Sequence, residues 1–82
     1  MSAFPGFLAW LKLQHVRHDP IGDLAGMAIS DPELEGREMD FDQLLRHVRA
    51  RGAHDLVVAI VLEARIDYEQ ARERFAVKYQ LH

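Results

Sequence analysis

The clearest helix start in this 82-residue chain is Asp19-Pro20-Ile21-Gly22-Asp23-Leu24-Ala25. An aspartate side chain accepts hydrogen bonds from the free amides that begin a helix, and proline suits the first helical position, where no amide hydrogen is needed. Asp23 adds a negative charge near the positive end of the helix dipole. Apolar residues then recur three and four positions apart. The stretch predicts an amphipathic helix that begins directly after Asp19.

Two glycines, Gly22 and Gly26, lie four residues apart on one face of this helix. Each lowers helix stability by about 1 kcal/mol relative to alanine. Such a cost is typical of positions where the helix backbone closely approaches another element. No glycine-rich turn between a strand and a helix surrounds Gly22, so a phosphate loop is excluded. We expect both glycines to mark close helix packing.

Prolines, glycines and capping residues divide the rest of the chain into further helices. The predicted segments are a helix from Pro5 to about Val16, the helix after Asp19, a short turn from Pro32 anchored by Leu34, a helix from Phe41 to about Arg51 capped by Asp40 and ended by Gly52, and a last helix capped by Asp55 and running to about Gln80. Strand signals are nearly absent, because the one β-branched run, residues 57–61, lies inside a much longer helical pattern.

The last helix changes character along its length. Residues 56–62 are apolar on every side, which is typical of a helix enclosed by others. A one-sided apolar stripe follows, formed by Ala64, Tyr68, Ala71, Phe75 and Tyr79. At 1.5 Å per residue this helix spans about 38 Å, whereas a globule of this size has a diameter of roughly 30 Å. We expect its last turns to overhang the body and to be covered by the N-terminal segment or by a second chain.

Composition and pattern together predict one domain, residues 1–82, with an all-α fold: a compact bundle of four to five helices with a long C-terminal helix. The apolar fraction of 49% and the charged fraction of 28% are ordinary for a globular protein. The predicted core consists of Trp10, Leu24, Leu45, Val58 and Leu62.

Several short motifs of this chain match a known pattern. They are Trp10-Leu11-Lys12, residues 19–25, Asp31, Asp40-Phe41, and Ala64 with Tyr68 four positions later. On these motifs the chain resembles the YozE-type, sterile-alpha-motif-like small bacterial proteins over roughly residues 7–68. It departs from them at Leu34-Glu35, where that family has Phe-Pro, and at Ala64-Arg65, where it has Ala-Trp. The resemblance implies a helical bundle without enzymatic activity, whose fold relatives mostly bind proteins and in a few cases RNA.

The residue types exclude several classes of function. The chain has no cysteine and no threonine, and its only serines are Ser2 and Ser30, so no candidate nucleophile stands out. No apolar run approaches the roughly 20 residues that a membrane span needs. The N-terminal residues lack the basic flank and apolar stretch of a signal peptide, so we expect a cytoplasmic protein. We expect no enzyme, no cofactor and no small-molecule substrate.

Histidines raise the question of a metal site. His15 and His18 are three residues apart and Asp19 follows, so three candidate ligands fall within five residues. Their spacing crosses a predicted helix end, however, and no His-Glu-x-x-His pattern is present. We therefore expect no metal there.

The order of charges along the chain is uneven. Residues 31–42 contain six acids and one base, whereas residues 43–54 contain three arginines, two histidines and no acid. Part of this order complements the helix dipole. It also predicts an acidic connector and a basic helix end on different parts of the surface, an arrangement that favours head-to-tail contacts or a partner of complementary charge.

These observations favour a non-catalytic protein–protein interaction module that binds a protein partner or a second copy of itself. The predicted interaction surface comprises Arg46, Arg49, Arg51, Arg65, Tyr68, Arg72 and Phe75. The alternative is a small nucleic-acid-binding protein. Its basic patch would join Lys12, His15, Arg17, His18, Arg46, Arg49 and Arg51 at the ends of the helices 5–16 and 41–51. The net charge of −3 and the lack of aromatic residues near these bases weigh against it.

Overall fold

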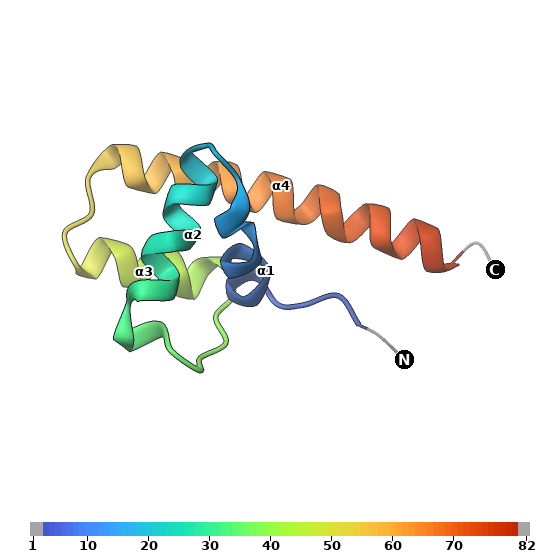
Figure 1. Cartoon of the computed structure of the whole chain (residues 1–82), viewed down its shortest axis with the longest axis horizontal. Coiled ribbons are helices and arrows are strands. Elements are labelled where there is room, and N and C mark those ends of the chain that lie inside the picture. Colours follow the sequence, from blue (N-terminus) through green and yellow to red (C-terminus); the bar gives the residue numbers. More distant parts are fainter. Residues whose placement is uncertain (1–2, 81–82) are drawn as a thin grey trace.

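The computed structural model of the chain describes residues 3–80, with side chains as far as residue 78. Its elements are α1 (Phe7–Leu13), the short 3-10 helix η1 (Gln14–Val16), α2 (Pro20–Ser30), the short 3-10 helix η2 (Pro32–Leu34), α3 (Phe41–Ala50) and α4 (Asp55–Gln80). Residues 3–80 contain no strand, and the predicted all-α bundle with a long last helix is confirmed (Figure 1). Of the predicted stripe, the Tyr79 side chain lies outside the described part.

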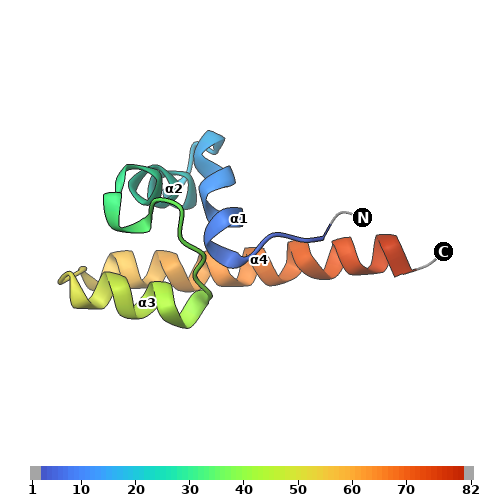
Figure 2. The ribbon, with the colours of Figure 1, turned by 90° about the horizontal axis from the view of Figure 1, so that it is seen from below.

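The helices form a bundle at one end of an elongated molecule. The helix α3 runs antiparallel beside the first half of α4, and α1 and α2 pack across them (Figures 1 and 2). The second half of α4 projects beyond the other helices, with the N-terminal segment beside it. The principal extents of 46 × 23 × 23 Å confirm the predicted overhang. No helix within residues 3–80 has both the length and the apolar character needed to cross a bilayer.

The predicted caps of α2 and α3 are confirmed. The Asp19 carboxylate accepts a hydrogen bond from the Gly22 amide at 2.8 Å, and Pro20 occupies the first helical position. Asp40 and Gln43 form a reciprocal capping box: the Gln43 amide donates to the Asp40 carboxylate at 2.8 Å, and the Asp40 amide donates to the Gln43 side chain at 2.9 Å. Local side-chain chemistry therefore sets both helix starts.

The turn between α3 and α4 follows the prediction at one end only. Gly52 has a φ of +77°, the left-handed conformation that glycine adopts at low cost after a helix. Asp55, predicted as the cap of the last helix, is instead its first helical residue. The carbonyl of His54 accepts from the amides of Val57 and Val58 at 2.9 and 3.2 Å. The helix therefore begins one residue earlier than predicted.

The core forms where α1, α2, α3 and the middle of α4 meet. Its largest fully buried side chains are Leu8, Leu11, Leu44 and Val61. Of the predicted core, Trp10 and Leu24 are buried, and Leu45 packs against the core while partly exposed.

The remaining two core predictions are corrected by the structure. Val58 is half-buried outside the core cluster, and Leu62 is 43% exposed. Leu56 at the start of α4 is 72% exposed, so residues 56–62 are not enclosed. The physical reason is size, because three partner helices of 7 to 11 residues cover only one side of α4.

The N-terminal segment covers part of the overhanging helix. This is one of the two alternatives predicted from the sequence, the other being cover by a second chain. The Phe4 ring lies 5.5 Å from the Tyr68 ring and 5.4 Å from the Phe75 ring, measured between centroids. The Tyr68 hydroxyl donates a 2.8 Å hydrogen bond to the carbonyl of Pro5. These contacts bury apolar surface that a single helix would leave in water.

The two glycines of α2 have different surroundings. A methyl group on Gly22 would overlap the backbone carbonyl of Arg17, so the predicted close approach is confirmed there. At Gly26 no atom lies within 4 Å of the position that a methyl group would take, so the same prediction is wrong for Gly26. Only the first glycine is required by packing.

Candidate functional site

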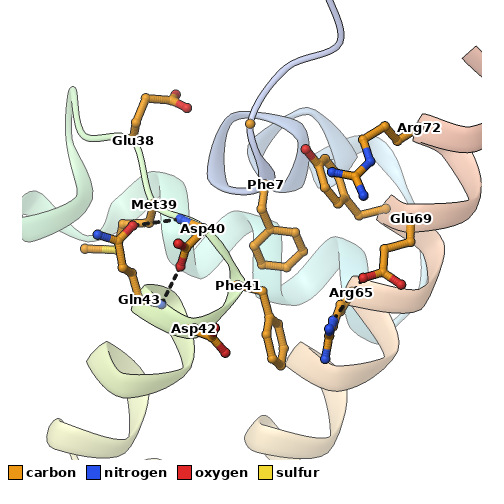
Figure 3. Close-up of a pocket in the computed structure, with 12 residues that line it drawn as sticks. Phe7, Glu38, Met39, Asp40, Phe41, Asp42, Gln43, Arg65, Glu69 and Arg72 are labelled. Carbon is orange, nitrogen blue, oxygen red and sulfur yellow. Dashed lines mark hydrogen bonds and ion pairs between the residues drawn. The ribbon is translucent and has the colours of Figure 1, made fainter. Parts of the chain in front are cut away.

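A surface hollow of about 410 Å³ lies between the start of α3 and the middle of α4. We call it the α3–α4 hollow, and it is lined by Gly6, Phe7, Glu38, Met39, Asp40, Phe41, Asp42, Gln43, Arg65, Tyr68, Glu69 and Arg72. Figure 3 shows the α4 side chains on one side of it and those of α3 and the preceding connector on the other. Three elements distant in sequence thus build one site.

Aromatic rings form the base of this hollow. Phe7 meets Phe41 edge-on at 6.0 Å and Tyr68 edge-on at 5.3 Å, and Trp10 meets Tyr68 at 5.5 Å. Such edge-to-face pairs are favourable beyond the area that they bury. Since Pro5 also holds the Tyr68 hydroxyl, the base is rigid.

Two arginines of α4 lie over these rings. The guanidinium carbon of Arg65 is 4.6 Å from the centroid of Phe41, and that of Arg72 is 5.6 Å from the centroid of Tyr68. Both distances fit a cation–π contact. Arg65 also forms an ion pair with Glu69 at 3.1 Å. The hollow therefore already holds guanidinium groups against aromatic faces.

The lining of the hollow is negative on balance. It contains four carboxylates, from Glu38, Asp40, Asp42 and Glu69, against the guanidinium groups of Arg65 and Arg72. Asp40 caps α3 and Glu69 pairs with Arg65. Glu38 and Asp42 are exposed, and within residues 3–78 neither side chain takes part in an ion pair.

A second cluster joins η2 to the end of α3. The His47 ring nitrogen Nε2 lies 3.0 Å from Asp31, and Nδ1 lies 3.8 Å from Glu33. Arg51 reaches both carboxylates, at 3.4 Å from Asp31 and 3.0 Å from Glu33. The hydrogen bond with His47, followed by that from the Glu33 amide, lowers the pKa of Asp31 below its ordinary 3.8.

This cluster corrects the predicted separation of charges. The acidic connector and the basic end of α3 were expected on different parts of the surface, but Asp31 and Glu33 lie directly against His47 and Arg51. Leu34, 2% exposed, holds the connector on the core beside α3, which brings the opposite charges within reach. The charges that remain unpaired on this part of the molecule are therefore fewer than the sequence suggests.

Asp31, Glu33 and His47 also present ligand atoms within 4.8 Å of one another, a spacing that could hold a metal ion. Arg51 already supplies a positive charge to both carboxylates, so the geometry is that of an ion-pair network. The sequence pattern does not indicate this cluster, because Asp31 and His47 are 16 residues apart in the chain and only the fold brings them together.

A third network ties the turn before α2 to α4. Arg17 forms ion pairs with Asp19 at 2.7 Å and with Asp67 at 3.1 Å. The amide of Gly22 and the Arg17 guanidinium hold the pKa of Asp19 below its ordinary 3.8, and the bond with Asp19 raises that of Arg17. Asp67 was not predictable as a partner of Arg17, because it lies 50 residues away in the chain.

The predicted single basic patch is not formed. Lys12 donates to the carbonyl of Leu34 at 2.8 Å, and Arg17 and Arg51 are both engaged by carboxylates. Arg17 lies beside Asp67, which is about 18 Å along α4 from its start at Asp55, near which α3 ends. Because α1 and α3 end at different places along α4, their bases do not meet.

The seven residues of the predicted interaction surface lie in four different places. Arg46 and Arg49 are exposed on α3, whereas Arg51 belongs to the cluster with Asp31. The α3–α4 hollow brings Arg65, Tyr68 and Arg72 together. Phe75 packs against Phe4.

An apolar groove, not anticipated from the sequence, runs between α2 and the beginning of α4, and η2 and the end of α3 also line its larger hollow. We call it the α2–α4 groove. It consists of two adjoining hollows of about 560 and 390 Å³ that share Leu24, Met27 and Val57. Met27 is 59% exposed and Leu56 is 72% exposed at its edges. The sequence predicts Leu56 as part of an enclosed segment, because hydrophobicity alone does not tell which side of a helix lacks a partner.

The shifted pKa of Asp31 predicts a pH dependence of stability. A carboxyl whose pKa is lower in the folded protein stabilises the fold above its ordinary pKa, and this contribution is lost as the pH falls. Asp31→Asn should therefore lower the free energy of unfolding at pH 7, and its difference from the unmodified protein should shrink below about pH 4. Urea unfolding followed over a pH series measures both curves.

Glu35→Gln is the matched control, since Glu35 is an exposed connector carboxylate that forms no ion pair within the described side chains. It should change the stability little at any pH. A difference between Asp31→Asn and the unmodified protein that stays constant from pH 7 to pH 3 would contradict the role assigned to this ion-pair cluster.

Comparison of the chain with protein-family models, with curated proteins and with solved structures finds no match. The resemblance to the YozE-type proteins therefore stays a prediction. What can be said about function rests on the geometry of the groove, the hollow and the ion pairs described above.

Proposed function

We propose that this protein is a non-catalytic interaction module that binds a helix of a partner protein in the α2–α4 groove. The observation that carries this proposal is the exposure of Met27 and Leu56 on the two edges of an apolar groove whose floor is Leu24 and Val57. Large apolar side chains gathered at one hollow of a small protein are typical of protein-binding surfaces. A groove between two helices accepts an amphipathic helix through apolar residues on one face.

The state of the ionisable groups also supports a binding role. Among the described residues, the pKa values that depart from their ordinary range belong to Arg17, Asp19 and Asp31, and each is shifted toward the charged form: Asp19 chiefly by the hydrogen bond from the Gly22 amide, and Arg17 and Asp31 chiefly by side-chain hydrogen bonds with Asp19 and His47. A general acid or base works best with a pKa near the operating pH, which requires shifts in the opposite direction. These groups stabilise the fold and are poorly suited to proton transfer.

Nucleic-acid binding is supported less well. Of the predicted basic residues on α3, only Arg46 and Arg49 are unpaired within residues 3–78, and Asp42, one helical turn before Arg46, shares their face of α3. A carboxylate on the same face would repel a phosphate backbone. This alternative stays a prediction.

The proposal is tested by Leu56→Asp. A charge at the edge of the groove should weaken binding of the partner roughly tenfold to hundredfold, because the burial of one leucine is worth about 1.5 to 3 kcal/mol. Chemical cross-linking in the cells that express the protein, followed by a binding titration with the captured partner, measures the effect. Leu56 is exposed near the start of α4, so the fold should tolerate the change.

The matched control is Ile66→Asp, which places the same charge on the same helix at a residue that is 55% exposed and lies outside the groove. It should leave partner binding unchanged. Equal binding by the unmodified protein and by Leu56→Asp would exclude the α2–α4 groove as the binding site.

A further inference from the structure

We propose that the partner helix of the α2–α4 groove is basic at one end, and that it places lysine or arginine side chains over Asp23 and Glu63, where the groove meets the beginning of α2. We call these two residues the acidic rim. This inference rests on the proposed function, because it concerns the same groove. It adds which charges the partner carries and where they lie, which the apolar side chains of the groove leave open.

The first observation is that the smaller hollow of the groove is lined by charges of one sign. Asp23 comes from α2 and Glu63 from α4, and the other residues that line this hollow are uncharged. Both side chains are exposed, and within residues 3–78 neither forms an ion pair. The apolar floor with Leu24 and Val57 belongs to the same hollow. A helix that covers this floor therefore lies beside two free carboxylates.

The second observation is that the base beside the acidic rim is already paired. Glu63 also lines an adjoining hollow of about 330 Å³, to which Arg17 contributes as well. The Arg17 guanidinium is held by Asp19 at 2.7 Å and by Asp67 at 3.1 Å, and both of these carboxylates line that hollow too. Together the two hollows present four carboxylates against one guanidinium. This surface therefore stays negative, and a partner has to supply the cations.

The third observation is that the larger hollow, at the end of the groove nearer to α3, has a different charge balance. Its carboxylate belongs to Asp31, which His47 and Arg51 already hold at 3.0 and 3.4 Å. The remaining ionisable residue of its lining is His54. Among the described residues that line the groove, the unpaired carboxylates thus lie at the acidic rim. A partner needs cations at that end and needs none at the other.

Burial makes the acidic rim selective. When a helix covers the groove, water is removed from around Asp23 and Glu63, and a carboxylate that loses water without gaining a partner raises the free energy of the complex. A lysine or arginine of the partner replaces the lost water by an ion pair, whereas a glutamate adds repulsion. The apolar floor therefore supplies affinity, and the acidic rim determines which amphipathic helices bind.

Three synthetic helices test this charge preference. Each has about 18 residues, enough to form a helix, and the same stripe of leucines at spacings of three and four. The polar positions of the first and last turns are all lysine, all glutamate or all glutamine. In about 20 mM salt the lysine peptide should bind the full chain about tenfold more tightly than the glutamate peptide, and this ratio should shrink in about 300 mM salt. Fluorescence anisotropy of labelled peptides measures each dissociation constant.

Charge reversal locates the preference. The double variant Asp23→Lys/Glu63→Lys should raise the dissociation constant of the lysine peptide about tenfold or more and should make the glutamate peptide the tighter ligand. Glu63→Lys alone lies in the middle of α4, away from any helix end, and should shift both constants in the same direction. It keeps the test valid if a lysine in the first turn of α2 weakens the fold, which circular dichroism checks.

The matched control is Asp42→Lys/Glu73→Lys, which changes the net charge by the same amount. Asp42 lies in the first turn of α3, as Asp23 lies in the first turn of α2. Glu73 is an exposed acid of α4, as Glu63 is, and neither control residue lines the α2–α4 groove. This variant should leave the order of the three peptides unchanged.

The outcomes separate this inference from the proposed function. If Leu56→Asp weakens binding of the glutamine peptide but the lysine peptide is not preferred, the acidic rim is wrong and the groove stands. If Asp42→Lys/Glu73→Lys removes the preference as fully as Asp23→Lys/Glu63→Lys does, net charge is its cause and the inference is wrong. No binding of any peptide would overturn both proposals. Self-association of the unmodified chain that Leu56→Asp abolishes in sedimentation would place a second copy in the groove and overturn the inference.

Discussion

Replacing Gly22 by alanine is expected to lower the free energy of unfolding by about 3 kcal/mol and the melting temperature by roughly 15 °C. A methyl group at this position would overlap the backbone carbonyl of Arg17. Flexible side chains move aside at low cost, but a backbone atom does not. The Arg17 backbone is further restrained by a 3.0 Å hydrogen bond from its amide to the Gln14 carbonyl and by the two ion pairs of its side chain. Thermal unfolding followed by circular dichroism measures the effect.

Gly26→Ala is the control for this experiment, since it makes the same change in the same helix. No atom lies within 4 Å of the added methyl group, and alanine favours a helix by about 1 kcal/mol over glycine. This variant should therefore be as stable as the unmodified protein or more stable, by up to about 1 kcal/mol. If the two variants were equally stable, the close approach of α2 to the Arg17 turn would not exist in solution.

Leu44→Ala should lower the free energy of unfolding by about 3 kcal/mol. The Leu44 side chain is 1% exposed, and truncation of a buried leucine removes its burial and leaves a cavity, a loss of about 2 to 5 kcal/mol. Leu44 is the buried residue of α3, whereas Phe41, Leu45 and Val48 pack against the core while partly exposed. Urea unfolding at pH 7 measures the loss directly as a shift of the midpoint.

Leu62→Ala makes the same chemical change at a residue that is 43% exposed. It should change the stability by no more than about 0.5 kcal/mol, the usual range for surface positions. A loss comparable to that of Leu44→Ala would mean that the open side of α4 is covered in solution. The two variants therefore test together that Leu44 belongs to the core and that Leu62 does not.

The interaction surface was only partly predictable. The sequence predicts Arg65, Tyr68 and Arg72 as a surface of the last helix, and the fold brings them together at the α3–α4 hollow. Nothing in the sequence places Phe41, on the other side of the hollow, against the last helix. Its contact with Arg65 joins residues that are far apart in the chain. Helix periodicity gives the face of a residue but does not say which other helix lies opposite.

The sequence by itself determined where α2 and α3 begin and where α3 ends, because caps, proline and glycine act within three or four residues, whereas the helix predicted from Pro5 begins at Phe7 and α4 begins one residue before its predicted start. Asp19, Asp40 and Gly52 do so in the structure as expected. It also determined that α4 outgrows the bundle, since helix length follows from residue number. Only the tertiary structure decided which side of α4 stays open and which charges cancel. Whether Leu62 is buried or exposed, and whether Asp31 pairs with His47, depends on which residues of another element lie opposite. The hydrophobicity and charge along one segment do not specify those residues.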